Sequence, residues 1–256
     1  MARTTAILDQ TDLKESLRAA ARRSMKDIIA ERLATMIGSG ALSVGDPLPS
    51  ERELSSAMGV SRETIRGALL ILSTRGILSV AQGARTTVAS AEVGELGLRK
   101  VLPGMAEYDL DDVHEGRLLV EGHLARLAAH APEARTLARL ADLIEEQRRA
   151  KDDPVRYLIL DREFHAVIYR SAGNQVLSDL AVTLYAYLLN HRRRAVSRPG
   201  AIGRSIADHE AILAALEARD GAAAAEAFGV HERRIYETTR RLMKTDGHPT
   251  TGGDQP

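Results

Sequence analysis

The chain has 256 residues, with 35 Lys and Arg against 35 Asp and Glu, so its formal net charge is zero. This length exceeds that of a usual single domain and predicts two domains. With 44% hydrophobic and 27% charged residues, the composition is typical of a globular protein and excludes the disordered and collagen-like classes. Aromatic residues make up only 3%, which favours cores of Ala, Leu, Ile and Val and therefore helices over sheets.

The absence of cysteine excludes disulfides, thiolate metal ligands and cysteine nucleophiles, and it favours a cytoplasmic location. No apolar run approaches the roughly 18 residues of a membrane span, so no membrane partner is expected. Residues 1–90 carry 12 Lys and Arg against 9 Asp and Glu, and the remaining residues carry 23 against 26. An N-terminal part with a net positive charge, followed by a part with a net negative charge, permits DNA binding.

Residues 23–90 show the pattern of three short helices followed by a hairpin. Apolar residues recur at helical spacing, a serine precedes two of the segments as a cap, and a glycine separates those two. The helices are predicted at about 28–37, 51–58 and 62–74. Two β-prone stretches flank Gln82 and Gly83, which predicts a wing. The segment therefore predicts a winged helix-turn-helix.

The remainder of the chain predicts a second, all-helical domain. Residues 91–111 contain several Gly and Pro residues and are expected to form a linker, and residues 112–243 show long amphipathic segments without a competing strand signal. The helices are predicted at about 112–130, 133–150, 154–171, 174–196, 202–218 and 221–243. Residues 1–22 are expected to form a flexible arm, and residues 244–256 a disordered tail. The predicted fold class is thus mainly α.

The third predicted helix begins with the sequence SRETIR, and its polar side chains gather at its N-terminal end. A helix that enters the major groove contacts bases and phosphates with that end. Arg62 and Arg66 are four residues apart and share a face, from which Arg reads the edge of guanine. Ser61 and Thr64, with the helix N-terminus, can hold phosphates. The alternative is that these arginines only solvate a helix surface.

The stretch LPSERELSSAMGVSRETIRGALLILSTRGIL resembles the winged-helix signature of the GntR superfamily, over about residues 24–90. This resemblance implies binding to double-stranded operator DNA. The positions that match the DNA-contacting residues of the family are Arg52, Ser61, Arg62, Thr64, Arg66, Gln82 and Gly83. Two positions depart from the family pattern: Glu63 stands where Thr or Pro is frequent, and Gly67 replaces a common Glu. The wing sequence QGARTTV is more similar to the FadR branch.

One carboxylate and three histidines of the second domain form a pattern that suits a metal ion. Asp161 and His165 are four residues apart and share a helix face, and His209 and His231 lie on two later helices. Three His and a carboxylate without Cys suit zinc, nickel or manganese, with positions left for water or a ligand. Histidine must be neutral to bind a metal, so occupancy is expected to fall below about pH 6.5. Taken singly, each His can instead be a buried structural residue.

The same half of the chain, over about residues 112–240, resembles the FCD ligand-binding domain of the FadR subfamily. The family pattern of Asp-x-x-x-His, Ser-x-x-x-His and a last His matches the four positions just named, with Ser205 before the second His. The resemblance implies that a metal and an Arg of the first helix grip the carboxylate of a small organic acid. That Arg is Arg117, although Arg117 and Glu121 can instead form a salt bridge on a helix surface. The run 192–194 of three Arg is expected at a solvated helix end or an interface.

These patterns together predict a metabolite-responsive repressor rather than an enzyme, with a small organic acid as effector. A homodimer is expected, because two heads about 34 Å apart match successive major grooves of a palindromic operator. The alternative is a metal-dependent hydrolase, since His and carboxylate ligands with an open site can activate water. Against it, the sequence has no HExxH motif, and Glu210 is the only candidate general base beside the proposed ligands.

Overall fold

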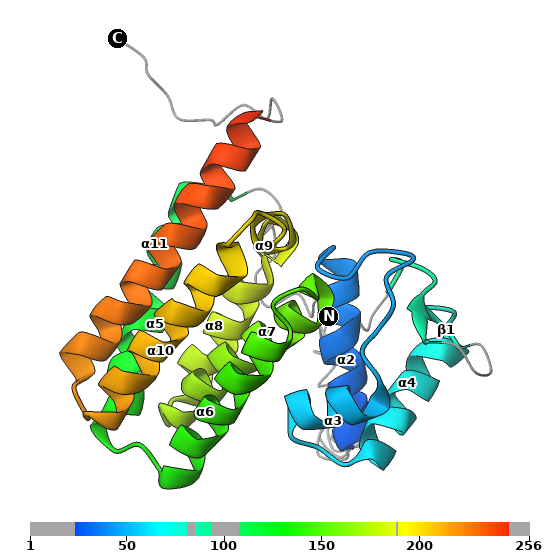
Figure 1. Ribbon diagram of the computed structural model, residues 1–256, viewed down its shortest axis with the longest axis horizontal. Helices are drawn as coiled ribbons and strands as arrows, with labels where there is room; N and C mark the ends of the chain where they lie inside the picture. The colour runs from blue at the N-terminus through cyan, green and yellow to red at the C-terminus, as the bar shows by residue number, and fades with distance from the viewer. Residues whose placement is uncertain (1–23, 81–84, 94–107, 188, 246–256) are drawn as a thin grey trace, which may run out of the picture.

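The computed structural model describes residues 24–80, 85–93, 108–187 and 189–245. They form two groups of helices side by side, a small one with α2 to α4 and a larger one with α5 to α11 (Figure 1). The arm at 1–22, most of the linker and of the tail, and the wing residues Gln82 and Gly83 lie outside the described residues. None of the described helices is both long and apolar enough to cross a membrane.

The small domain contains three helices and a short hairpin. Its elements are α2 (Met25–Gly38), α3 (Glu51–Met58), α4 (Arg62–Thr74), β1 (Leu78–Ser79) and β2 (Thr87–Val88). Helix α3 begins at the predicted capping box, in which the Ser50 backbone N–H donates to the Glu53 carboxylate at 2.9 Å. It ends at Gly59, whose φ of 65° is the left-handed conformation that glycine adopts without strain.

The two strands close this domain on one side. They pair antiparallel, with Leu78 opposite Val88, and both of these side chains are buried against the helices. The departure at Gly67 has a packing reason, because a Cβ at this position would lie only 3.1 Å from the side chain of Lys26 on α2. The glycine therefore lets α2 lie close against α4.

The large domain is built of helices alone. Its helices are α5 (Leu110–His130), α6 (Ala134–Arg149), α7 (Pro154–Ser171), α8 (Gln175–Tyr187), α9 (Leu189–Val196), α10 (Ala201–Glu217) and α11 (Gly221–Thr245). Five of the predicted helices agree with these bounds to within two residues. The segment 174–196, predicted as one helix, is instead described as two, α8 and α9.

Helix α7 lies at the centre of the molecule. It packs against α5, α6, α8 and α9 of its own domain and against α3 of the small domain (Figure 1). Consecutive residues from Tyr157 to Ala166 are therefore buried, polar ones included. A polar group removed from water needs a partner, so the charged residues of α7 are candidates for a site.

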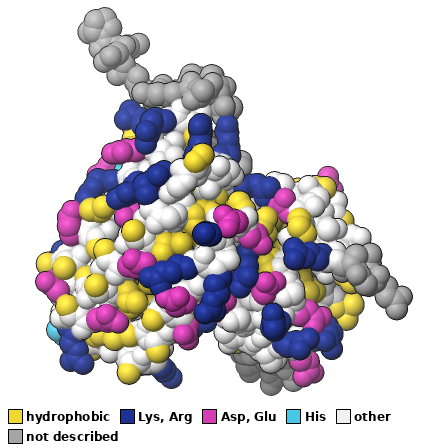
Figure 2. All heavy atoms as spheres, viewed as in Figure 1, with side chains coloured by type: hydrophobic (Ala, Val, Ile, Leu, Met, Phe, Trp, Pro, Cys, Tyr) yellow, Lys and Arg dark blue, Asp and Glu magenta, His cyan; other side chains and the backbone are white. Residues whose placement is uncertain are grey.

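Charged side chains also join the two domains. Arg32 of α2 contacts Glu163 of α7 at 3.2 Å, and Ser56 of α3 donates a hydrogen bond to Glu146 of α6 at 2.7 Å. A third connection comes from α9, described below. Figure 2 shows basic side chains beside acidic ones along this boundary. The small domain is therefore held by specific polar contacts to the helices that carry the candidate site.

Candidate functional site

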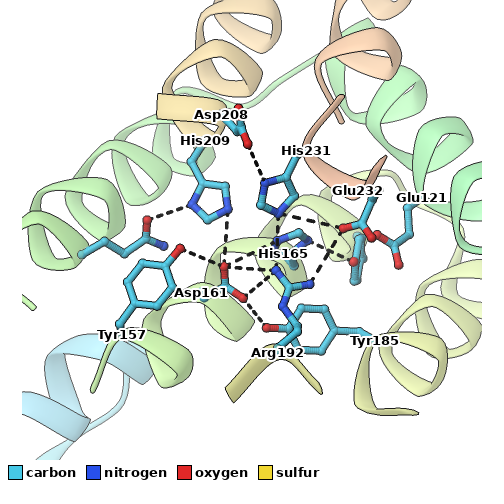
Figure 3. Close-up of polar contacts among 12 residues, drawn as sticks. Glu121, Tyr157, Asp161, His165, Tyr185, Arg192, Asp208, His209, His231 and Glu232 are labelled. Carbon is cyan, nitrogen blue, oxygen red and sulfur yellow. Dashed lines mark hydrogen bonds and ion pairs between the residues drawn. The ribbon is translucent and has the colours of Figure 1, made fainter. Parts of the chain in front are cut away.

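The four predicted metal ligands lie together inside the large domain. Asp161 and His165 come from α7, His209 from α10 and His231 from α11, and all four side chains point toward one another (Figure 3). Each is at most 1% exposed. One ligand atom from each residue can be chosen so that all four atoms lie within 4.8 Å of one another. Helices distant in the sequence thus bring together one oxygen and three nitrogen donors.

Two of the histidines are oriented by hydrogen bonds at their Nδ1 atoms. His209 Nδ1 lies 2.8 Å from the side-chain oxygen of Gln147, and His231 Nδ1 lies 3.4 Å from a carboxylate oxygen of Asp208. An amide or carboxylate oxygen only accepts, so the histidine nitrogen must donate. The proton of each neutral ring therefore sits on Nδ1, and Nε2 presents a lone pair to the centre of the site.

The third histidine also has a polar contact at Nδ1. His165 Nδ1 lies 3.2 Å from the hydroxyl of Tyr169, which can donate or accept a hydrogen bond. The Nε2 atoms of His165 and His209 are buried and have no hydrogen-bond partner within the part of the chain that the structure describes. A buried nitrogen lone pair without a partner is unfavourable, and a metal ion would satisfy it.

The protonation states of these residues favour a cation. Burial, together with the nearby Arg192 charge, lowers the pKa of His165 well below its usual value. Burial and the neighbouring His231 lower the pKa of His209 in the same way. Burial would raise the pKa of Asp161, but the charge of Arg192, the hydrogen bond from Tyr185 and the neighbouring histidines together outweigh burial, and the pKa is lowered. At neutral pH the site therefore offers one carboxylate and at least two neutral imidazoles.

The donor set fits a divalent metal ion. Bonds of about 2.1 Å place ligand atoms on opposite sides of a metal about 4.2 Å apart, so ligands within 4.8 Å need only small side-chain movements. His165 also belongs to a second buried combination, with Glu121 of α5 and Glu232 of α11. The two combinations share one histidine and make a continuous buried polar cluster.

Arg192 of α9 is part of this cluster. Its side chain is 3% exposed, and its Nη2 atom lies 3.0 Å from Asp161 Oδ2 and 3.4 Å from His231 Nε2 (Figure 3). Its guanidinium also lies over the ring of Tyr185, 4.6 Å from the centroid. The prediction of a solvated helix end or an interface for the 192–194 run does not hold for its first member, which is buried inside the large domain because α9 packs against α7, α8, α10 and α11. Arg194 is exposed.

Arg193 points to the small domain instead. Its Nη2 atom lies 3.0 Å from Asp46 Oδ1, and its Nη1 atom donates to the backbone carbonyl of Ala41 at 3.0 Å. This is the third connection between the domains. Successive residues of α9 thus contact the buried cluster and the small domain.

Arg117, the predicted effector ligand, is fully buried between two carboxylates. Its Nε atom lies 2.6 Å from Glu121 Oε1, and its Nη1 atom lies 2.9 Å from Glu232 Oε2. Burial raises the pKa of Glu121 to about 7, although the charge of Arg117 opposes this change. The expected pair with Glu121 is therefore formed, but in the interior and with Glu232 as a third member.

A narrow pocket, partly open to solvent, leads to the cluster between α9, α10 and α11. Four members of the cluster form part of its lining: Asp161, Arg192, Asp208 and His231. Toward solvent it is lined by basic and hydroxyl side chains: Arg204, Arg234, Ser205 and Thr238. Arg117 does not line it. A small acid entering here would pass the exposed Arg204 and Arg234 before it reached the buried Arg192.

The candidate DNA-contacting residues lie at the start of α4. Arg62 and Arg66 are 64% and 67% exposed, and both approach Glu51, at 3.9 Å and 2.9 Å. The hydrogen bond from Arg66 lowers the pKa of Glu51. Glu51 thus orients both arginines on one exposed face, where a nucleic acid can reach them.

The other predicted contacts of this helix behave as caps or surface groups. Ser61 is the N-cap of α4 and accepts a hydrogen bond from the Thr64 backbone N–H at 3.1 Å, and the two hydroxyls are 2.9 Å apart. Arg52 is exposed on α3. The structure thus brings Ser61, Arg62, Thr64 and Arg66 together at one helix end.

Sequence reasoning missed four residues of the buried cluster. They are Gln147, Asp208, Arg192 and Glu232. A signal existed for two of them: Asp208 directly precedes His209, and Glu232 directly follows His231. Charged residues next to proposed ligands are candidates for the groups that orient them. No sequence pattern pointed to Gln147.

Comparisons with known proteins agree with this arrangement. The family model "Bacterial regulatory proteins, gntR family" matches residues 26–88, and the model "FCD domain" matches residues 112–234. A protein of Cronobacter sakazakii named HTH-type transcriptional repressor NanR is 30% identical over 240 residues, which are 88% of each chain. The protein of the same name from Salmonella newport is 29% identical, over 91% of this chain and 93% of the Salmonella protein.

Among solved structures, the fold is similar to that of E. coli McbR/YncC. The TM-score is 0.53 at 22% identity, over 88% of this chain and all of the other. The expected two-domain architecture, mainly α with a winged helix-turn-helix and an FCD helical bundle, is confirmed. The chain belongs to the GntR family of bacterial regulatory proteins, carries an FCD domain, and is a DNA-binding transcription regulator.

Proposed function

We propose that this protein is a repressor that binds a palindromic operator as a homodimer and responds to a small organic acid at a metal-containing pocket. The observation that carries the proposal is the convergence of four buried ligand atoms, two of them from α7, the helix that also contacts the DNA-binding domain. Repression is supported by the relatives, which are named repressors and match most of this chain. The family otherwise leaves the sign of regulation open.

In this proposal residues 23–90 bind DNA, residues 91–111 link the domains, and residues 112–243 sense the effector. Arg62 and Arg66 read bases in the major groove, since they are exposed on one face at the start of α4. Ser61 and Thr64 hold phosphates at the same helix end, Arg52 reaches the DNA backbone, and the wing pair Gln82 and Gly83 lies at the minor groove. Two heads are needed because one short helix buries too little surface for specific binding.

The metal would be held by Asp161, His165, His209 and His231. Their donor chemistry suits zinc, nickel or manganese. Such an ion supplies a fixed positive charge that binds a carboxylate. The protein's own residues then set the rest of the site: Gln147 and Asp208 orient two of the rings, and the pocket leads an acid to Arg192.

The response to the effector would travel through neighbouring residues of two helices, α7 and α9. Glu163 lies between Asp161 and His165 and contacts Arg32 of the small domain. Arg193 follows Arg192 and contacts the small domain as well. Because residues adjacent on a helix point in different directions, one residue contacts the site and its neighbour contacts the DNA-binding domain. A movement of α7 or α9 in the site would therefore alter the placement of the DNA-binding domain.

The same chain is not expected to catalyse hydrolysis. Glu210, the only general base that the sequence offers, is 44% exposed and lies 2.5 Å from Arg148 on the surface. A base for a metal-bound water must lie within hydrogen-bond reach of that water.

Two double variants test the proposal. Arg62→Ala with Arg66→Ala is expected to abolish the gel shift of operator DNA while leaving the metal content unchanged. His209→Ala with His231→Ala is expected to lower the metal content, measured by elemental analysis, and to remove the effector response while the small domain still binds DNA. Unchanged DNA binding in the first variant would refute the DNA contacts, and full metal occupancy in the second would refute the metal site.

A further inference from the structure

We infer that the Arg192 guanidinium is an internal cation that competes with the metal ion for Asp161 and His231. The inference rests on the metal site of the proposed function and adds a residue that controls its affinity. In this reading Arg192 occupies part of the position that the metal takes, and it must leave before the metal can bind.

The contacts of Arg192 are those that a metal would need. Its Nη2 atom lies 3.0 Å from Asp161 Oδ2 and 3.3 Å from Asp161 Oδ1, so it approaches both carboxylate oxygens. The same atom lies 3.4 Å from His231 Nε2. His231 Nδ1 donates to Asp208, so Nε2 is the acceptor in this contact. One guanidinium nitrogen thus uses donor atoms from two of the four proposed ligands.

A metal ion and this guanidinium cannot share these atoms. Two cations a few ångströms apart repel each other strongly in a site shielded from water. The metal would also draw the four ligand atoms closer than the 4.8 Å within which they now lie. A metal ion on His231 Nε2 would also take the one lone pair that Arg192 now contacts.

The structure offers a second position for the displaced side chain. Arg192 Nη1 lies 3.8 Å from Glu232 Oε1, which has no hydrogen-bond partner among the described residues, whereas the other carboxylate oxygen is paired with Arg117 at 2.9 Å. Arg192 also lines the pocket that opens to solvent. A small rotation of the guanidinium toward Glu232 therefore keeps it paired while it frees Asp161.

The test is the zinc affinity of Arg192→Met, measured with zinc alone by competition against a chelating dye. A residue that only orients a ligand would, when replaced, weaken metal binding about 10- to 100-fold. A competitor would do the opposite, and we expect zinc affinity to rise about 10-fold or more. The matched control is Arg204→Met, which removes the same charge from the same pocket, at an exposed side chain of its lining. Its zinc affinity should stay close to that of the wild type.

Two further measurements keep the test decisive if Arg192→Met does not fold. Arg192→Gln retains hydrogen-bond donors without the charge and should also bind zinc more tightly. In a crystal structure of the zinc-loaded wild type, the guanidinium should have left Asp161 for Glu232. Equal or weaker zinc binding by the folded variants, or Arg192 still on Asp161 beside bound zinc, overturns the inference while the metal site stands. Absence of zinc binding in the wild type and in the Arg192 variants overturns both.

Discussion

The contact between Arg32 and Glu163 offers a quantitative test of communication between the two domains. Arg32 Nη1 donates to both carboxylate oxygens of Glu163, at 3.3 Å and 3.2 Å, and the two side chains are 19% and 4% exposed. Hydrogen bonds to charged groups contribute about 1.5–3 kcal/mol each. Glu163 keeps Arg162 at 2.8 Å and Arg170 at 3.5 Å, so Arg32→Met leaves no unpaired buried carboxylate. We therefore expect the lower end, about 1.5 kcal/mol.

Arg32→Met therefore destabilises only the arrangement in which the two domains contact each other, by about this free energy. If effector and metal act by changing the balance between this arrangement and another, Arg32→Met shifts the balance about tenfold. Operator affinity is measured by fluorescence anisotropy with and without bound metal and acid. The ratio of these two affinities in Arg32→Met should then differ from the wild-type ratio by about that factor. The matched control is Arg170→Met, which removes an arginine from the same carboxylate but lies in the same domain as Glu163.

The reasoning fails if Arg32→Met binds operator with the wild-type ratio although the protein is folded, since the contact would then have no part in communication. Equal changes in Arg32→Met and Arg170→Met would also contradict it. They would indicate that the charge balance of Glu163, and not its contact with the small domain, sets the ratio.

Two further predictions concern the metal site. Gln147→Leu removes the acceptor that orients His209, so we expect zinc affinity to fall about 10- to 100-fold with the four ligands intact, as checked by dye competition; an unchanged affinity would show that this hydrogen bond is dispensable. Burial lowers the pKa values of His165 and His209, so protons compete with zinc only at a pH lower than for ordinary histidine. Zinc should therefore be retained below pH 6.5 in a release titration, and half-release near pH 6.5 would contradict the lowered values.

Local sequence signals predicted most of the helices, since caps and breaks are determined by a few neighbouring residues. The capping box at Ser50 and the N-cap at Ser61 begin helices at the predicted residues. The grouping of the metal ligand candidates could also be predicted, because residue type and order along the chain resemble a family pattern. Neither signal depends on knowing which helices are neighbours.

The role of Arg192 could not be predicted in this way. It stands in a run of three arginines on a short helix, and the sequence does not show that α9 is covered by four other helices. Only packing separates Arg192, which is buried, from Arg193, which contacts the small domain. The burial of Glu232 could not be predicted for a similar reason, since it depends on α5 lying along α11 (Figure 1). Long-range packing therefore decides which charges belong to the site.

The charges of the buried cluster bear on the effector itself. Three carboxylates, those of Glu121, Asp161 and Glu232, lie with the two guanidinium groups of Arg117 and Arg192, and each of these side chains is at most 3% exposed. Asp208, which also belongs to the cluster, is paired with Arg234 at 3.1 Å. The five buried groups carry one negative charge when every carboxylate is ionised, and none when Glu121, whose pKa burial raises to about 7, is protonated. A divalent ion would therefore leave one or two positive charges. Because an unbalanced buried charge is costly, the metal-loaded site of the proposed function would favour at least one carboxylate group from outside. This charge balance is the reason to test small organic acids as effectors.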